Sequence, residues 1–312
     1  MKKILIDCDP GHDDAIAILT AIAQKDKLDI LGISTVGGNQ TLEKVTQNAK
    51  NILAFVGSSI PLVTGNDKPL IKQLETSDEA HGESGMDGPY FNGLDYPVKS
   101  TNAVTFMYDK LINSKEKVTI VGLGPLTNIA LLLKTYPECH EKIEEISIMG
   151  GGISRGNVTS TAEFNIYVDP EAANIVFNSG IRIIMSGLDV TEKAEITVSE
   201  IQQLKNKGRI SHLVFELLKF YNASGRQFGF INSPIHDLCA IMYLINSDIF
   251  GGKDYYVSVE TNEGSCRGLT YADKRIVSPN NKNTFVLTDV DRERFIQVLF
   301  ESLTTLDKEY VL

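Results

Sequence analysis

The sequence predicts an α/β fold built on a mostly parallel, open sheet with helices on its faces. β-Branched apolar runs alternate with segments of helical periodicity from the N-terminus onward, and this rhythm is typical of parallel strands that are joined by helices. A chain of 312 residues can bury a large core. We therefore expect one domain over residues 1–312, with additional helices and strands toward the C-terminus.

The expected strands of the first part of the chain lie near residues 3–8, 28–36, 117–122, 144–149 and 181–186. Helices fill the intervals between them. One helix begins at Asp169-Pro170-Glu171, because aspartate caps helix N-termini and proline suits the first turn. Gly180 follows the end of that helix, and Gly124-Pro125 opens another helix in the same way.

The regular alternation breaks in two places. Between about residues 66 and 98 the chain is rich in glycine, proline and aspartate, and a loop of that length in a compact domain is usually a lid or a disordered segment. After residue 188 come helices, then strand-like runs near 254–260, 267–277 and 284–288, and then a closing helix.

The composition excludes several classes of function. A formal net charge of −10, without a cluster of basic residues, argues against a nucleic-acid partner. The apolar run after Lys2-Lys3 ends at Asp7, which is too short for a signal peptide or a membrane span. The cysteines, at positions 8, 139, 239 and 266, show no CxxC spacing. We therefore expect them to be reduced packing residues of a cytoplasmic protein.

The most informative segment is the turn after the first strand, Asp7-Cys8-Asp9-Pro10-Gly11-His12-Asp13-Asp14. Four carboxylates repel one another on so short a turn unless a cation or a shared proton offsets the repulsion. The segment therefore predicts a metal site or a proton-transfer site. His12, and likewise His140 and His212, are expected to be surface residues.

Other expected strands end in residues that suit a polar ligand. Ligand sites in open α/β sheets form outside the carboxyl ends of the strands. The motifs that follow these ends, or lie in the loops beyond them, are Thr35-Val36-Gly37-Gly38-Asn39, Gly122-Leu123-Gly124, Met149-Gly150-Gly151-Gly152, Asn157, Glu163-Phe164-Asn165 and, much later, His236-Asp237. Glycines allow close approach to the backbone, and amides with carboxylates match sugar hydroxyls.

In this order along one chain, the motifs resemble the inosine-uridine nucleoside hydrolase family over essentially the whole sequence. The first motif looks like the family's DxDPGxDD signature. Further support comes from Val36-Gly37-Gly38-Asn39-Gln40-Thr41, His81-Gly82-Glu83-Ser84-Gly85, Leu126-Thr127-Asn128-Ile129-Ala130, Ala162-Glu163-Phe164-Asn165 and His236-Asp237. The resemblance implies hydrolysis of the N-glycosidic bond of ribonucleosides to ribose and free base, a role in nucleoside salvage, and a homodimer or homotetramer.

The resemblance also implies roles for individual residues. A Ca²⁺ ion at the bottom of the ribose pocket would be held by Asp9, Asp14, Asp237 and the backbone carbonyl of Leu123, all of which offer the hard oxygen donors that calcium prefers. Asp9 would also take the proton from the attacking water, His236 would protonate the leaving base, and Asp7 would brace the loop. The residues expected to contact the nucleoside are Asp13, Asn39, His81, Met149, Asn157, Glu163, Asn165 and Tyr221.

Alternative interpretations remain at this stage. Asp7 and Asp9 have the spacing of a haloacid dehalogenase-type phosphatase, but Pro10 and the lack of a matching lysine disfavour it. A non-catalytic calcium- or ribose-binding protein is a second alternative, although an EF-hand loop would need glutamate where Ile18 stands. Asn157 and Asn165 could simply form turns. Purine-cleaving members of the family place tyrosines before the His-Asp pair. In this sequence only Tyr221 corresponds to one of them, so the preferred base stays open.

Overall fold

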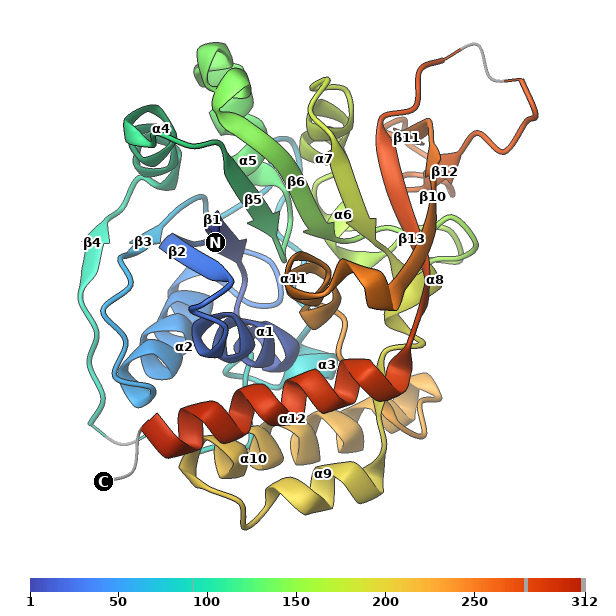
Figure 1. Ribbon diagram of the computed structural model, residues 1–312. Helices are drawn as coiled ribbons and strands as arrows, with labels where there is room; N and C mark the ends of the chain where they lie inside the picture. Colours follow the sequence, from blue (N-terminus) through green and yellow to red (C-terminus); the bar gives the residue numbers. More distant parts are fainter. Residues whose placement is uncertain (92, 278–279, 310–312) are drawn as a thin grey trace.

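The computed structural model describes residues 1–91, 93–277 and 280–309, and a nine-stranded sheet runs through them (Figure 1). Its strand order is β10-β13-β7-β6-β5-β1-β2-β3-β4. The bounds are β1 (Lys2–Cys8), β2 (Leu28–Thr35), β3 (Leu62–Thr64), β4 (Val98–Ser100), β5 (Val118–Gly122), β6 (Ile143–Met149), β7 (Ile183–Ser186), β10 (Phe250–Tyr255) and β13 (Thr284–Val290).

Neighbouring strands of this sheet run parallel, except that β10 pairs antiparallel with β13 at one edge. Two short antiparallel ladders lie outside it, β8 (Glu195–Ile196) with β9 (Ser233–Pro234) and β11 (Val257–Val259) with β12 (Thr270–Ala272). The predicted α/β class, with a mostly parallel sheet and additional C-terminal elements, is confirmed. The carboxyl ends of β1, β2, β5, β6 and β7 consequently share one edge.

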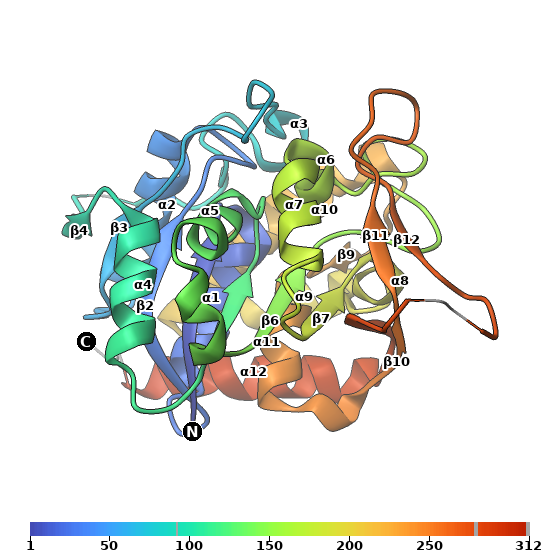
Figure 2. The same cartoon turned by 90° about the horizontal axis from the view of Figure 1, so that it is seen from above.

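Helices cover both faces of the sheet (Figures 1 and 2). On β1, Ile4 and Ile6 belong to the apolar cluster of one face and Leu5 to that of the other, as the alternation of side chains along a strand requires. The first face carries α1 (His12–Ala23), α2 (Leu42–Phe55) and α11 (Leu238–Ile245), with α9 (Val198–Leu204), α10 (Arg209–Gly225) and α12 (Arg292–Glu309) beyond them. The opposite face carries α4 (Ala103–Asn113), α5 (Thr127–Thr135) and α7 (Pro170–Phe177). The short helices are α3 (Asp78–His81), α6 (Phe164–Val168) and α8 (Leu188–Thr191), with 3-10 turns at Pro137–Lys142, Arg226–Phe228 and Ser247–Ile249.

The helix predicted at Asp169-Pro170 is α7, and the Asp169 side chain accepts a hydrogen bond from the backbone N–H of Ala172 at 3.0 Å. Two predictions in the C-terminal part are wrong. The run 254–260 is divided between β10 and β11, which belong to different sheets, and only Thr270–Ala272 within 267–277 is a strand. A β-branched run predicts an extended backbone, but the partner strands decide where a ladder begins and ends.

The stretch predicted to be a lid or a disordered segment, from about residue 66 to 98, contains α3 and is held against α10. The Ser224 hydroxyl donates to the Ala80 carbonyl at 2.8 Å, and the Gln227 amide donates to the Glu79 carbonyl at 2.7 Å. These contacts place α3 beside the carboxyl edge of the sheet.

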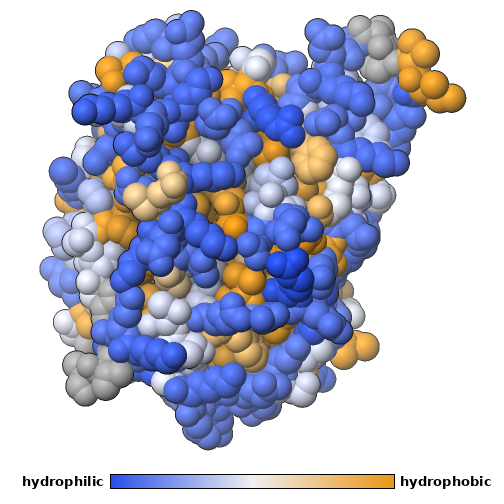
Figure 3. Space-filling view, viewed as in Figure 1, coloured by the Kyte–Doolittle hydropathy of each residue, from blue (hydrophilic) through white to orange (hydrophobic). Residues whose placement is uncertain are grey.

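The surface in the view of Figure 3 is mainly hydrophilic. An apolar projection marks the loop after β12, where Ile276 and Val277 are exposed. Of the cysteines, those at 8, 139 and 239 are buried, but Cys266 is exposed, so its prediction as a packing residue is wrong. Across the described segments, no helix is both long and apolar enough to cross a bilayer.

Candidate active site

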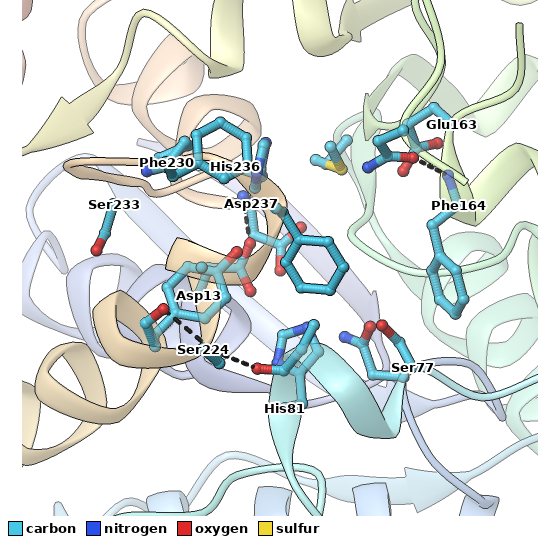
Figure 4. A pocket seen from close by; sticks show the side chains of 18 of the residues that line it. Asp13, Ser77, His81, Glu163, Phe164, Ser224, Phe230, Ser233, His236 and Asp237 are labelled. Carbon is cyan, nitrogen blue, oxygen red and sulfur yellow. Dashed lines mark hydrogen bonds between the residues drawn. The ribbon is translucent and has the colours of Figure 1, made fainter. Parts of the chain in front are cut away.

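A cavity of about 270 Å³ opens at the carboxyl edge of the sheet. It is lined by all the residues expected to contact the nucleoside, namely Asp13, Asn39, His81, Met149, Asn157, Glu163, Asn165 and Tyr221, and also by Leu123, His236 and Asp237. Figure 4 shows Asp13, Asp237 and His236 on one side of the cavity and Glu163 with Phe164 on the other. Asp9 and Asp14 are fully buried beside it.

The floor of the cavity is a cluster of carboxylates. Oxygen atoms of Asp13, Asp14 and Asp237 lie within 4.8 Å of one another, and all three side chains are buried. Asp13 and Asp14 lie in the first turn of α1, and Asp237 directly precedes α11. Helix N-termini favour negative charge, and the backbone N–H of Asp237 points to Asp13 Oδ2 at 3.4 Å. Two helix starts therefore bring together acids that lie far apart in the sequence.

Asp9 stands next to this cluster with one oxygen free. Its Oδ2 accepts the backbone N–H of Asn39 at 2.7 Å, whereas its buried Oδ1 has no hydrogen-bond partner among the described residues. Gly38 and Gly124 make room for the side chain: a Cβ atom would lie 2.1 Å from Asp9 Oδ2 at Gly38 and 2.3 Å from Oδ1 at Gly124. The strand-end glycines thus allow a carboxylate to be packed between two backbone segments.

The cluster carries a high electrostatic cost that a cation would offset. Burial, and then the charge of Asp14, raises the pKa of Asp9 well above its usual value. Burial, and then the charges of Asp13 and Asp14, does the same to the pKa of Asp237. Buried carboxylate oxygens and an unpaired Oδ1 form the donor set of a hard divalent cation. The residues present therefore fit a metal ion.

The opposite wall is held by its own hydrogen bonds. Glu163 accepts the backbone N–H groups of Gly151, Asn165 and Ile166 at 2.8, 3.0 and 3.3 Å, while burial raises its pKa. The Asn165 amide donates to the carbonyl oxygens of Leu123, at 2.7 Å, and Met149, at 3.2 Å.

Asn157 also has a structural contact, because its side-chain oxygen accepts the Phe164 N–H at 3.0 Å. Its contribution to the local turn, which the sequence left open, therefore coexists with its place in the cavity wall. Asp7 turns away from the cavity and accepts hydrogen bonds from Ser34 and Asn128, and burial raises its pKa to about 7. These contacts connect the end of β1 to β2 and α5.

His236 is oriented by a residue that the sequence did not indicate. Its Nδ1 lies 2.7 Å from the hydroxyl of Thr191, on α8. Thr191 is fully buried, and its hydroxyl has no second hydrogen-bond partner among the described residues, so the hydroxyl donates to Nδ1. Burial, and then the charge of Arg155, lowers the pKa of His236 to about 4. A neutral ring then carries its hydrogen on Nε2.

His12 is not at the surface, and the prediction that it would be is wrong. It is fully buried, with its ring stacked on His81, Phe220 and Tyr221 at centroid distances of 5.3, 5.1 and 5.5 Å. The covering residues come from α3 and α10, which are remote from position 12 in sequence, so no local pattern reveals this burial.

Other cavity residues were also missed. They are Ser77, Ala80, Arg155, Val158, Phe164, Ser224, Gly225, Phe228, Phe230, Asn232, Ser233 and Pro234. Arg155 forms an ion pair with Glu192. The aromatic residues at 228 and 230, shortly before His236, were the available signal for an apolar wall.

Comparison with known proteins gives one consistent class. The family model described as inosine-uridine preferring nucleoside hydrolase matches residues 4–297. The pyrimidine-specific ribonucleoside hydrolase RihA of Escherichia coli O81 (strain ED1a) is 44% identical over 304 residues, covering 96% of this chain and 97% of that protein. RihA of Salmonella paratyphi B is 45% identical with the same coverage.

Solved structures agree with this class. A plant nucleoside hydrolase, PpNRh1, is 31% identical with a TM-score of 0.90, covering 97% of this chain and 99% of that one. The purine-preferring ribonucleoside hydrolase of Gardnerella vaginalis is 28% identical with a TM-score of 0.92, covering 99% and 100%.

Replacing Gly124 tests the packing around Asp9. In Gly124→Ala the new methyl group would displace the Asp9 carboxylate, and changes beside metal ligands typically cost 10- to 100-fold in affinity. We expect calcium titration calorimetry on the metal-free protein to show a loss of about that size. Gly251→Ala is the matched control, since its Cβ would meet only the Asp289 side chain, at 3.2 Å. Equal affinity in both variants would contradict the expected crowding.

Proposed function

The chain belongs to the inosine-uridine preferring nucleoside hydrolase family, and we propose that within this family it acts on pyrimidine ribonucleosides. As a ribonucleoside hydrolase it cleaves the N-glycosidic bond to give ribose and a free base. The identity of 44% to proteins named pyrimidine-specific, over nearly the full length of both chains, carries the proposal. The purine-preferring structure is more distant in sequence, at 28% identity.

A panel of nucleosides tests the base preference. We expect kcat/KM for uridine and cytidine to exceed that for inosine and adenosine by at least about tenfold, since a pocket that fits one base discriminates by this order or more. Reducing-sugar release measures all four. Preference for inosine would overturn the pyrimidine assignment alone, whereas no release from any nucleoside would contradict ribonucleoside hydrolysis itself.

We further propose that Asp9, Asp14, Asp237 and the Leu123 carbonyl hold a Ca²⁺ ion. The oxygen-only donors and the unpaired Oδ1 of Asp9 support this choice over zinc. When bound, such a cation offsets the carboxylate charges and lowers the pKa of a coordinated water. Asp9 accepts a proton from the attacking water as the water oxygen bonds to the ribose carbon and the carbon–nitrogen bond breaks.

The ribose lies, in this proposal, between the two walls of the cavity. Asp13, Asn39, Asn157, Glu163 and Asn165 bind its hydroxyls, and Met149 packs against the ring. The sugar becomes oxocarbenium-like as the base departs. Buried carboxylates already held by backbone N–H groups stabilise this positive charge without first having to reorient.

Asp9→Asn tests the role of Asp9 as general base separately from any effect on folding. The substitution removes a negative charge and the proton acceptor, and a positioned base contributes about 10²–10⁴ in rate. We expect turnover of uridine to fall by about that range while circular dichroism stays unchanged. Asp26→Asn, at an exposed position, is the control.

Elemental analysis of the wild-type protein should find about one calcium per chain, the occupancy that a single site requires. Stoichiometric zinc without calcium would overturn the choice of metal. An Asp9→Asn variant that keeps a tenth of the wild-type kcat would overturn the role of Asp9.

At the base end of the cavity we propose that His236 is the general acid. In this role the ring first takes up a second proton, so that Nδ1–H donates to the Thr191 hydroxyl. The imidazolium then passes its Nε2 proton to the departing base and returns to the neutral ring that Thr191 orients. His81 and Tyr221 lie on the same side, where they contact the base. The aromatic side chains of Phe228 and Phe230 add apolar surface to the wall there.

A pair of substrates tests the role of His236. A p-nitrophenyl riboside needs no protonation of its leaving group, so His236→Ala should lose about 10²-fold or more on a natural nucleoside and little on the activated riboside. Thr191→Val should show the same pattern more weakly, and Thr191→Ser, which keeps the hydroxyl, should restore activity.

Calcium content must be measured in each preparation because Asp237 adjoins His236. If calcium is retained and both substrates slow by the same factor, His236 orients the site instead of donating a proton.

The family resemblance also supports a homodimer or homotetramer in the cytoplasm with a role in nucleoside salvage, and we propose these as well. Sedimentation of the purified protein tests the oligomeric state, and a strictly monomeric species would contradict it.

A further inference from the structure

His12 is a buried residue that the proposed reaction does not use. Its ring lies between the start of α1, the α3 segment and α10, and its plane is within 2° of parallel to that of Phe220. Burial lowers its pKa to about 4. A polar ring kept in such surroundings needs hydrogen-bond partners, and those of His12 lead directly to the cavity.

The hydrogen-bond partners of His12 assign its tautomer. Nε2 lies 2.7 Å from the carbonyl oxygen of Asp87, and because a carbonyl can only accept, Nε2 carries the hydrogen. In a neutral ring Nδ1 is then an acceptor. Nδ1 of His12 lies 3.1 Å from Nδ1 of His81, so His81 is the donor in this contact.

A second contact reaches the same atom of His81. The backbone N–H of His12 also points to His81 Nδ1, at 3.4 Å, the longer of the two distances, and a hydrogen on Nδ1 would exclude this weaker hydrogen bond. If His81 accepted this N–H instead, the two Nδ1 lone pairs would face each other at 3.1 Å. Donation by His81 avoids that repulsion and leaves Nε2 of His81 as its acceptor nitrogen.

His81 lies where its Nε2 can accept a hydrogen bond from a ligand in the cavity. It lines the cavity, and its Nε2 forms no hydrogen bond to any described residue. Gly11 lets the ring approach the acidic turn, since a Cβ there would lie 2.5 Å from His81 Nδ1. The backbone on the N-terminal side of His81 is tied to α10 through Ala80 and Ser224. Figure 4 shows the His81 ring beside the cavity.

We propose that His12 is a positioning residue that holds His81 with Nε2 as a hydrogen-bond acceptor toward the base. His81 then selects bases that present an N–H at this point, such as N3–H of uracil or the amino N4–H of cytosine. The proposal rests on the proposed function, because it assumes that a nucleoside occupies the cavity, and it names a residue that shapes the preference of the site.

Matched variants separate hydrogen bonding from packing. His12→Asn keeps an acceptor near the position of Nδ1, His12→Gln keeps a donor near that of Nε2, and His12→Phe keeps only the stacked ring. We expect kcat/KM for uridine to fall about tenfold in the Gln and Phe variants, the scale of one hydrogen bond, and much less in the Asn variant. His140→Gln, on a partly exposed histidine, is the control. Equal losses in all three variants would overturn the proposal.

Two measurements test whether His12 acts on the substrate through His81. The preference for uridine over 3-methyluridine should fall in His12→Gln toward its value in His81→Ala. The double variant should lose no more activity than His81→Ala alone, since residues acting as one unit are not additive. Additive losses with an unchanged preference would overturn the proposal.

A measurement on the wild-type calcium-loaded protein needs no folded His12 variant. Histidine ¹⁵N NMR at pH 7, with His81 assigned from the spectrum of His81→Gln, should show the hydrogen of His81 on Nδ1. A hydrogen on Nε2 would overturn the proposal. Wild-type protein that releases no ribose from any nucleoside would instead contradict the proposed function, so the two failures are distinguishable.

Discussion

The repulsion among buried carboxylates at the end of β1 is the constraint on which the rest of the site depends. Asp9, Asp13 and Asp14 come from one turn, and Asp237 joins them from more than two hundred residues away. Backbone N–H groups of Gly11 and Asn39 accommodate part of the charge, but the second Asp9 oxygen has no partner in the part of the chain that the structure describes. Burying so many acids away from bulk solvent is costly unless a cation neutralises them. The glycines at 38 and 124 make room for the Asp9 carboxylate, and the starts of α1 and α11 supply the other acids.

The cavity wall that contains Glu163 and Asn165 illustrates a second principle, which is preorganisation. Glu163 and Asn165 are oriented by hydrogen bonds to the backbone around β5 and β6 before any ligand enters. Parallel strands deliver their loops to one edge, so the wall and the acidic floor face each other across a short gap. Groups that are already oriented need little rearrangement when charge develops on a bound ligand.

The side of the cavity that contains His81 and Tyr221 is built differently. It consists of α3, the end of α10 and the segment before His236, which are connected by stacked rings and by a few side-chain to backbone hydrogen bonds. His12 links this side to the acidic turn. The acidic turn at the end of β1 and the His81 side of the cavity therefore meet at His12, although they belong to different layers of the fold.

The sequence by itself determined the α/β class, the strand ends that carry the ligands, and the family, because periodicity and motif order are local properties of the chain. It also indicated residues that the structure gathers at one cavity. Tertiary structure alone decided that His12 is buried, that Thr191 orients His236, that Asp13 joins the metal-type cluster, and that 254–260 is divided between two sheets. Each of these depends on contacts between segments remote in sequence, and such contacts leave no periodic signal in either segment.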